Sequence, residues 1–221
     1  CNNPCNDGEV CSSGTCDVSC QAGLTECSGM CVDTDYDPDN CGMCDNVCEE
    51  GLCSEGQCIS LPYDLLDVAT QSSIYTSMAR GYYFQAPVDL YILGLRVPPE
   101  AGTEDQNIHL IKFNSGPPPT FSSTTSDFTT LAYSSTIPGD EWFTVGVYIE
   151  AGTWVGVLGT RGSSDANSYG PTPYTTSFGS YSVTITRLLY QGSIDGGPAT
   201  EVSNEPSGNI GRVEMKYLVL N

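Results

Sequence analysis

Alternation of apolar and polar residues dominates the chain from residue 59 onward. In YSVTITR (181–187), Tyr181, Val183 and Ile185 face one way, and Ser182, Thr184 and Thr186 face the other. The segment VDLYILGLRV (88–97) is apolar on both faces, as a strand covered on both sides would be. Period-two alternation with β-branched and aromatic residues predicts strands, and no window of a dozen residues has a helical period. The predicted strands lie near residues 63–69, 73–78, 80–86, 88–97, 106–113, 128–133, 141–150, 153–160, 181–187 and 210–220.

These strands, separated by turns rich in Gly and Pro, predict an all-β fold, an antiparallel β-sandwich of jelly-roll type. The clearest predicted hairpin is EWFTVGVYIEAGTWVGVLGT (141–160), which turns at Ala151 and Gly152. The opposed pairs in that register are Ile149 with Trp154, Val147 with Gly156 and Val145 with Leu158. The face turned to the core carries Phe143, Val145, Val147, Ile149, Trp154 and Leu158. The other face carries Trp142, Thr144, Tyr148 and Val155.

Cysteine divides the chain into two parts. An even number of cysteines in a short stretch predicts a disulfide framework, formed in an oxidising compartment. We expect six disulfides of undetermined connectivity in a stapled module at residues 1–58, which precedes the β-sandwich at 59–221. The cysteines are Cys1, Cys5, Cys11, Cys16, Cys20, Cys27, Cys31, Cys41, Cys44, Cys48, Cys53 and Cys58.

The cysteine spacing repeats within the module. CNDGEVCSSGTC (5–16) matches CEEGLCSEGQC (48–58), which indicates one full unit at 20–58 preceded by part of another at 1–16. The run C-x-x-GLTEC-x-G-x-CVDT-x-x-DPDNCG-x-C-x-x-x-C (20–48) resembles the cysteine-rich repeats of the plant stigma-specific protein family and its bacterial relatives. This resemblance implies a bacterial cell-surface location and a module for structure or interaction, without catalytic residues. The large domain loosely resembles β-sandwich accessory modules of bacterial surface proteins through GYYFQAPVDLYILGLRV and WFTVGVYIEAGTWVGVLG.

Zinc is an alternative role for the cysteines. Cys41, Cys44 and Cys48 have the spacing of metal ligands. Zinc modules rarely use twelve thiols, however, and the single histidine, His109, lies far along the chain. We therefore expect disulfides and no zinc site.

Calcium is a weak candidate at four alternating carboxylates, which are Asp33, Asp35, Asp37 and Asp39. They imitate the start of an EF-hand loop, but Pro38 stands where that loop needs Gly, and Cys44 stands where it needs Glu. The alternative is a series of Asx turns that shape the loop before Cys41. No other cofactor is expected.

The charge of the chain limits its partners. With 27 acidic and 7 basic residues, the formal net charge is −20. Nucleic acid and anionic membrane surfaces attract a surplus of Lys and Arg, so neither is an expected partner. No stretch approaches the ~20 apolar residues of a membrane-spanning helix. A lipid anchor on Cys1 is an alternative, but it would leave one of the other cysteines without a partner.

The chemistry of a hydrolase is missing from the sequence. There is no G-x-S-x-G motif and no cysteine after Cys58, and His109 lies in the apolar strand NIHLIKF. Phosphate loops and dinucleotide fingerprints are also absent. We therefore expect a protein that is not an enzyme.

Two functions fit these features. The first is an extracellular structural protein that assembles with copies of itself or with other surface proteins into a filament or layer. Its candidate assembly strand ends at Leu218, Val219 and Leu220, which pair either within their own sheet or with a neighbour.

The alternative is an adhesive or glycan-binding sandwich on a disulfide-rich stalk. Residues 120–130 and 168–181 look like long exposed loops rich in Ser, Thr and Tyr, which suit recognition. The candidate contact residues are Trp142, Tyr148, Tyr169 and Tyr174.

Overall fold

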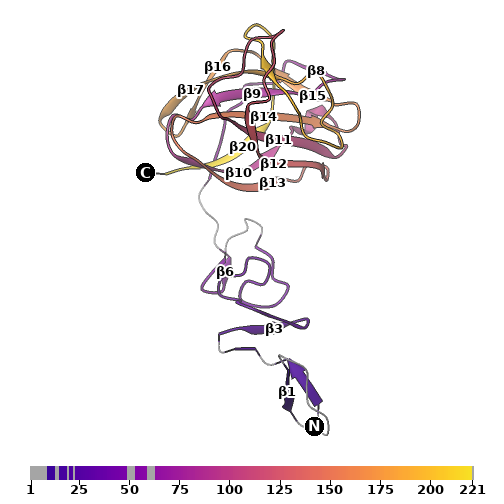
Figure 1. Ribbon diagram of the computed structural model, residues 1–221, viewed down its shortest axis with the longest axis vertical. Helices are drawn as coiled ribbons and strands as arrows, with labels where there is room; N and C mark the ends of the chain where they lie inside the picture. Colours follow the sequence, from indigo (N-terminus) through magenta and orange to yellow (C-terminus); the bar gives the residue numbers. More distant parts are fainter. Residues whose placement is uncertain are drawn as a thin grey trace. The chain divides into compact units, whose positions relative to one another are not determined.

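The computed structural model describes residues 20–21, 23–48, 53–58 and 63–220, together with the backbone at 9–12 and 15–18. The chain divides into two compact units, Cys1–Pro62 and Tyr63–Asn221, and both are seen in Figure 1. The division falls four residues after the boundary that the cysteine content suggested. Cys1 and Cys5 lie outside the described residues, as do the side chains of Cys11 and Cys16.

The first unit is here called the cysteine unit, and its described residues form three short antiparallel hairpins. They pair β1 (Glu9–Ser12) with β2 (Thr15–Val18), β3 (Thr25–Cys27) with β4 (Met30–Val32), and β5 (Cys53–Ser54) with β6 (Gln57–Cys58). Four disulfides connect the described part of this unit: Cys20–Cys31, Cys27–Cys44, Cys41–Cys53 and Cys48–Cys58. Because each bridge interleaves with another along the sequence, the bridges join the β3–β4 hairpin, the β5–β6 hairpin and the loop 33–40 into one body.

Sulfur forms the interior of the cysteine unit. Among its described side chains, the buried apolar ones are Cys27, Cys41 and Cys48. Five larger apolar side chains in the described part of this unit are exposed, namely Leu24, Met30, Tyr36, Met43 and Val47. Such a unit buries too little apolar surface to offset its conformational entropy without cross-links.

The second unit is a sandwich of antiparallel sheets. Its four-stranded sheet has the order β13 (Phe143–Ile149), β10 (Leu90–Arg96), β20 (Glu214–Val219) and β7 (Asp64–Leu65). The seven-stranded sheet has the order β12 (Phe128–Ile137), β11 (Gln106–Phe113), β14 (Trp154–Arg161), β9 (Arg80–Gln85), β17 (Tyr181–Leu189) and β16 (Tyr174–Phe178), with β18 (Ser203–Asn204) also paired to β17. A small sheet joins β19 (Ile210–Gly211), β15 (Asn167–Gly170) and β8 (Ser73–Tyr75), and one 3-10 turn, η1, spans Pro99–Ala101.

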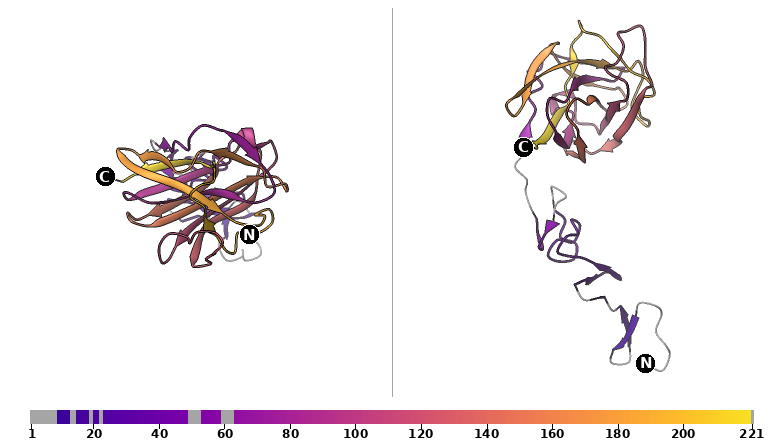
Figure 2. Two further views of the ribbon diagram at one scale, coloured as in Figure 1. Left: turned by 90° about the horizontal axis from the view of Figure 1, so that it is seen from above. Right: turned by 60° about the vertical axis from the view of Figure 1, so that its left-hand side comes forward.

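The strand pairs confirm the jelly-roll type of sandwich. β9 pairs with β14, β10 pairs with β13, and β11 pairs with β12. The three pairs fall alternately in the seven-stranded, the four-stranded and again the seven-stranded sheet, as a two-stranded ribbon folded across a sandwich does. The sheets curl around a shared core, as the two views in Figure 2 show.

The predicted hairpin at 141–160 is wrong, because β13 and β14 belong to different sheets. The chain crosses between the sheets at residues 150–153, beside the crossing from β9 to β10. Gly152 N–H donates to Ala86 O at 2.8 Å, Ala86 N–H donates to Thr153 O at 2.8 Å, and Ala151 N–H donates to Asp89 Oδ1 at 2.7 Å. Local alternation fitted a hairpin equally well, but the long-range partners of both strands decided the pairing.

This crossing also changes which residues of β14 face the main core. Val155 and Val157 pack in the core between the sheets, together with residues of β9, β10 and β20. Trp154 and Leu158 point to the opposite side of the seven-stranded sheet and join a second apolar cluster that includes Ile111 and Leu188. Trp154 is thus a packing residue, as predicted, but in a different layer, and Val155 is buried instead of outward-facing.

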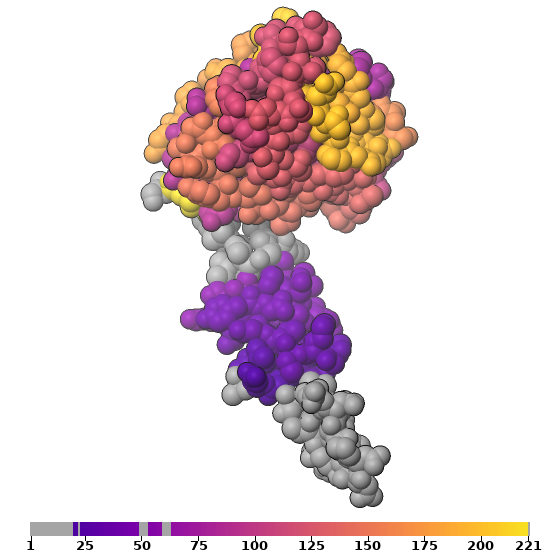
Figure 3. Space-filling view, viewed as in Figure 1, coloured from indigo at the N-terminus to yellow at the C-terminus, as the bar shows by residue number. Residues whose placement is uncertain are grey.

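The two segments expected to be long exposed loops are largely structured. Residues 128–130 begin β12, and 168–181 contain parts of β15, β16 and β17. Bridges Thr120↔Asn204 and Thr125↔Val202 join the remaining loop to the segment around residue 203. This loop and the segment around residue 203 lie side by side on the surface shown in Figure 3. Sequence patterns missed β15 and β16 because Ser, Thr, Pro and Gly dominate there.

Candidate docking surface on the four-stranded sheet

One face of the four-stranded sheet packs on the core, and the other is left uncovered by the strands of the sandwich. The register places Tyr91 between Tyr148 and Leu218, and it places Gly94 between Thr144 and Lys216. A register shift between Ile92 and Gly94 lets Tyr91 and Gly94 both face outward, while Ile92 and Leu95 face the core. We call the uncovered side the outer face. It carries Tyr63, Leu65, Tyr91, Arg96, Trp142, Thr144, Tyr148, Glu214, Lys216 and Leu218.

Cations and aromatic rings gather at one end of the outer face. The Arg96 Cζ atom lies 4.5 Å from the ring centre of Trp142, and the Lys216 Nζ atom lies 4.9 Å from it. Lys216 Nζ is also 4.3 Å from the ring centre of Tyr63. These are distances at which a cation is attracted to an aromatic ring. Arg96 is also paired with Glu214, with Nη2 and Nε at 2.6 and 2.7 Å from Oε2.

The other end of the outer face carries two tyrosine rings. Tyr91 is 36% exposed and Tyr148 is 48% exposed, and their ring centres are 5.6 Å apart with the planes at 57°. Leu65, on the edge strand β7, lies opposite Lys216 and is 60% exposed. The outer face thus combines large apolar side chains at the surface with two cations.

A buried arginine fixes the loop that leads into Trp142. The Arg161 side chain, at the end of β14, is fully buried. Its Nη1 donates to Glu104 O and Gly139 O at 3.2 and 2.7 Å. Its Nη2 donates to Val97 O and to Asp140 Oδ1 at 2.6 and 2.8 Å.

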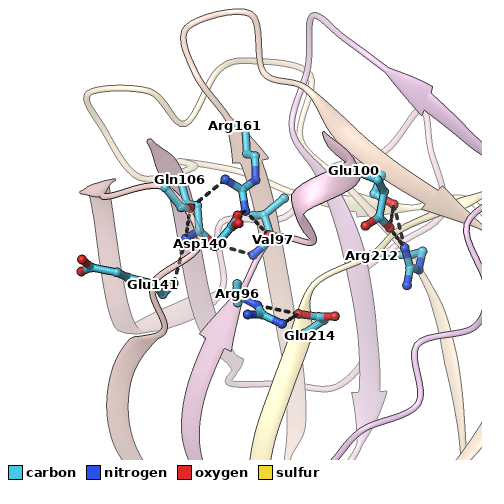
Figure 4. Close-up of polar contacts among 11 residues, drawn as sticks. Arg96, Val97, Glu100, Gln106, Asp140, Glu141, Arg161, Arg212 and Glu214 are labelled. Carbon is cyan, nitrogen blue, oxygen red and sulfur yellow. Dashed lines mark hydrogen bonds and ion pairs between the residues drawn. The ribbon is translucent and has the colours of Figure 1, made fainter. Parts of the chain in front are cut away.

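Gln106 extends the same network. Its Nε2 donates to Gly139 O and to Glu141 O, both at 2.8 Å, and its Oε1 accepts from Val97 N–H at 2.7 Å. Figure 4 shows this network beside the Arg96–Glu214 pair and the separate pair of Arg212 with Glu100. Trp142 therefore follows directly on a loop that the interior holds in place.

The four predicted contact residues do not form one site. Trp142 and Tyr148 lie at opposite ends of the outer face. Tyr169 is buried in β15 and stacks on Tyr75, with ring centres 5.4 Å apart, so its predicted surface role is wrong. Tyr174 lies in β16, and the hydrogen bond that it donates to Asp67 at 2.7 Å raises the pKa of its phenol.

Sequence reasoning missed Arg96, Lys216 and Tyr63. Arg96 is the one basic residue of the largely apolar segment 88–97, which was a usable signal of an outward position. Lys216 and Tyr63 come from distant parts of the chain, and only the pairing of β20 with β10 and β7 brings them to Trp142.

The candidate assembly strand lies inside its own sheet. β20 runs between β10 and β7, and Leu220 N–H donates to Asp89 O at 2.9 Å. Val219 packs against the main core, whereas Leu218 lies opposite Tyr91 on the outer face. Of the two alternatives for this strand, the structure has the pairing within its own sheet.

The calcium candidate is not assembled as a metal site. Asp33 Oδ1 accepts from Asp35 N–H at 3.1 Å, and Asp37 Oδ1 accepts from Asp39 N–H at 2.9 Å, which are Asx turns. In the described part of the chain, no three of these four carboxylates come close enough to share an ion. The Sγ atoms of Cys41, Cys48 and Cys53 lie within 4.8 Å of one another, but each is bonded in a disulfide.

His109 is part of the interior. Its Nδ1 accepts from Ala199 N–H at 3.2 Å, which leaves the proton on Nε2 to be donated to Thr130 Oγ1 at 2.8 Å. The rings of Phe128 and Tyr133 meet it edge to face. Burial disfavours the imidazolium and lowers the pKa of His109 from 6.5 to about 4.

This burial predicts a loss of stability on acidification. Between about pH 6.5 and pH 4 the unfolded chain binds a proton at His109 that the folded chain does not, so the free energy of unfolding falls as the pH falls. The loss attributable to His109 should approach roughly 3 kcal/mol near pH 4. Urea unfolding of the wild type and of His109→Gln at several pH values measures it. The variant should be less stable at neutral pH but should respond less to acid; equal slopes would contradict the assignment.

Comparison of the chain with protein-family models, with curated proteins and with solved structures finds no match. The described residues contain no helix long and apolar enough to cross a membrane. Four disulfides are consistent with a secreted protein.

Proposed function

We propose that this protein is an extracellular structural subunit that assembles through the outer face of the four-stranded sheet. The observation that carries the proposal is the grouping of half-buried Trp142, Arg96 and Lys216 on the outer face, beside exposed Tyr63 and Leu65. Trp, Tyr and Arg are the residues that contribute most to protein interfaces, and contiguous exposed apolar surface marks such interfaces. The rigid loop before Trp142 supports the same role, because a pre-ordered side chain loses less entropy on binding.

The cysteine unit supports an extracellular setting. Its described cysteines are all disulfide-bonded, and residues 20–58 resemble repeats found in exported surface proteins. A disulfide-stapled unit withstands proteases and reductants outside the cell, which suits a permanent structural protein.

Removing the indole should weaken assembly. In Trp142→Ala the association constant should fall by about 30-fold, the equivalent of ~2 kcal/mol for a central aromatic residue. Sedimentation velocity over a concentration series measures the assembly, and electron microscopy shows its form. Leu65→Asn, at the exposed edge of the outer face, should weaken assembly without disturbing the core.

Tyr181→Ala is the matched control, because Tyr181 is an exposed tyrosine on β17 of the other sheet. It should assemble like the wild type. If the wild type stays monomeric at all concentrations, or if both outer-face variants assemble normally, the proposal is wrong.

Glycan binding is the second candidate, favoured by the exposed rings of Tyr91 and Tyr148. Their planes are at 57°, so they do not offer a flat stacking surface to a chain of sugar rings. A glycan array probed with the wild type and with Tyr148→Ala separates the two functions. Binding that is lost in this variant, from a protein that does not assemble, would favour the glycan.

A further inference from the structure

We infer that the surface bound by the outer face is the acidic cysteine unit of a second copy, so that copies join head to tail. This inference rests on the proposed function and specifies its contact. The starting observation is that the basic residues are confined to one of the two units. All seven basic residues lie in Tyr63–Asn221, whereas twelve of the 27 acidic residues and no basic residue lie in Cys1–Pro62.

The second observation is an exposed aromatic side chain within this acidic unit. Tyr36 is 62% exposed, and the carboxylates of Asp33, Asp35 and Asp39 around it are exposed as well. We call residues 33–40 the acidic loop. It offers carboxylates and a ring to a surface on which cations lie over aromatic rings, so charge and ring chemistry are complementary.

The acidic loop is held in one conformation. The half-cystines Cys31 and Cys41 stand on either side of it. Inside it, Tyr36 N–H and Asp37 N–H donate to Asp33 O at 3.1 and 2.7 Å. At its ends, Gly42 N–H donates to Thr34 O and Cys48 N–H donates to Pro38 O, both at 2.8 Å. A loop fixed in this way loses little entropy when it docks.

Charge argues against the simpler contact between two outer faces. In a two-fold symmetric dimer one outer face meets another, so the Arg96 and Lys216 side chains of both copies enter one interface, with one Glu214 on each face to offset them. Like charges brought together in an interface oppose association, and here the alternative partner surface is acidic. The head-to-tail contact pairs opposite charges and leaves one unused surface at each end, so it continues into a chain or closes into a ring.

Two full-length variants test this contact by complementation. The face variant is Lys216→Glu. The loop variant combines Asp35→Asn, Tyr36→Ser and Asp39→Asn; it spares Asp33 and Asp37, whose carboxylates accept the turn hydrogen bonds. Each variant alone should associate at least about tenfold more weakly than the wild type. An equimolar mixture should form one-to-one pairs and stop there. The intact loop of the face variant and the intact face of the loop variant are both used in that contact, so neither is left for a third copy.

Sedimentation velocity of the wild type, each variant and the mixture gives distinguishable outcomes. A loop variant that assembles like the wild type, while the face variant does not, overturns the inference and leaves the proposed function standing. Two monomeric variants that fail to pair when mixed also overturn it. A monomeric wild type overturns both proposals. Unchanged thermal unfolding and unchanged disulfide content by mass spectrometry check that the variants are folded.

Discussion

Reduction of the disulfides should unfold the cysteine unit and leave the sandwich folded. The described part of the cysteine unit has four bridges, which close segments of 11, 17, 12 and 10 residues. A bridge that closes a loop of this size stabilises a fold by about 3 kcal/mol, chiefly by restricting the unfolded chain. The buried apolar groups of this part are themselves half-cystines, so little else holds it together. The sandwich contains no cysteine.

Limited proteolysis measures this difference. Trypsin is unsuitable, because Cys1–Pro62 contains no Lys or Arg. A protease that cleaves after Glu has sites at Glu26 and Glu55 and should cut there only in the reduced protein. Residues 63–220 should stay resistant in both states, with an unchanged unfolding temperature. The mass of the intact chain should rise by two hydrogens for each of the six expected bridges.

Two results would contradict this prediction. If the reduced cysteine unit still resists the protease, interactions other than the bridges hold it. If the sandwich unfolds at a lower temperature after reduction, the two units stabilise each other.

Replacement of Arg161 by Met should lower the free energy of unfolding of the sandwich by about 3–5 kcal/mol. The guanidinium is fully buried and donates to three backbone carbonyls, which are those of Val97, Glu104 and Gly139. Without it, Val97 O and Glu104 O lose this donor, and Gly139 O keeps only its hydrogen bond from Gln106 Nε2. Its carboxylate partner Asp140 is largely exposed and returns to water at little cost.

Urea and thermal unfolding of the full chain measure the effect, and the unfolding temperature should fall by roughly 10 °C. Arg161→Lys should recover only part of the loss, because one ammonium cannot replace the planar fork of donors. Lys112→Met is the matched control: Lys112 is an exposed cation on the adjacent strand β11, and its removal should change stability by under about 0.5 kcal/mol. A loss below about 1 kcal/mol for Arg161→Met would show that water replaces the guanidinium.

Local patterns predicted most of the strands but not all of their partners. The segments around 80–86, 106–113 and 153–160 alternate or are apolar enough to be recognised. The partner of β13 was mistaken because alternation within 141–160 fits a hairpin as well as it fits two strands of different sheets. The pairing of β13 with β10 depends on residues about 50 positions away, and such contacts leave no periodic signal in the sequence.

The candidate docking surface was predictable only in part. Trp142 and Tyr148 occupy outward positions of an alternating strand, and this placed them on the outer face correctly. Lys216 reaches Trp142 through β10, a strand that neither of them belongs to. Tyr169 was misplaced because its Ser- and Gly-rich surroundings resemble a loop, whereas stacking on Tyr75 buries it. The disulfide pairing could not be predicted, since cysteine spacing allows many connectivities.

The position of β20 sets the order in which the sandwich can fold. This strand is the last in the sequence, yet it lies between β10 and β7 in the four-stranded sheet. β10 therefore has an open edge until residues 214–219 have been synthesised, and the sheet cannot form from the amino-terminal end as the chain emerges. Contacts between strands so distant in sequence make folding slow. The core between the two sheets is therefore complete only when the last strand of the chain has joined it.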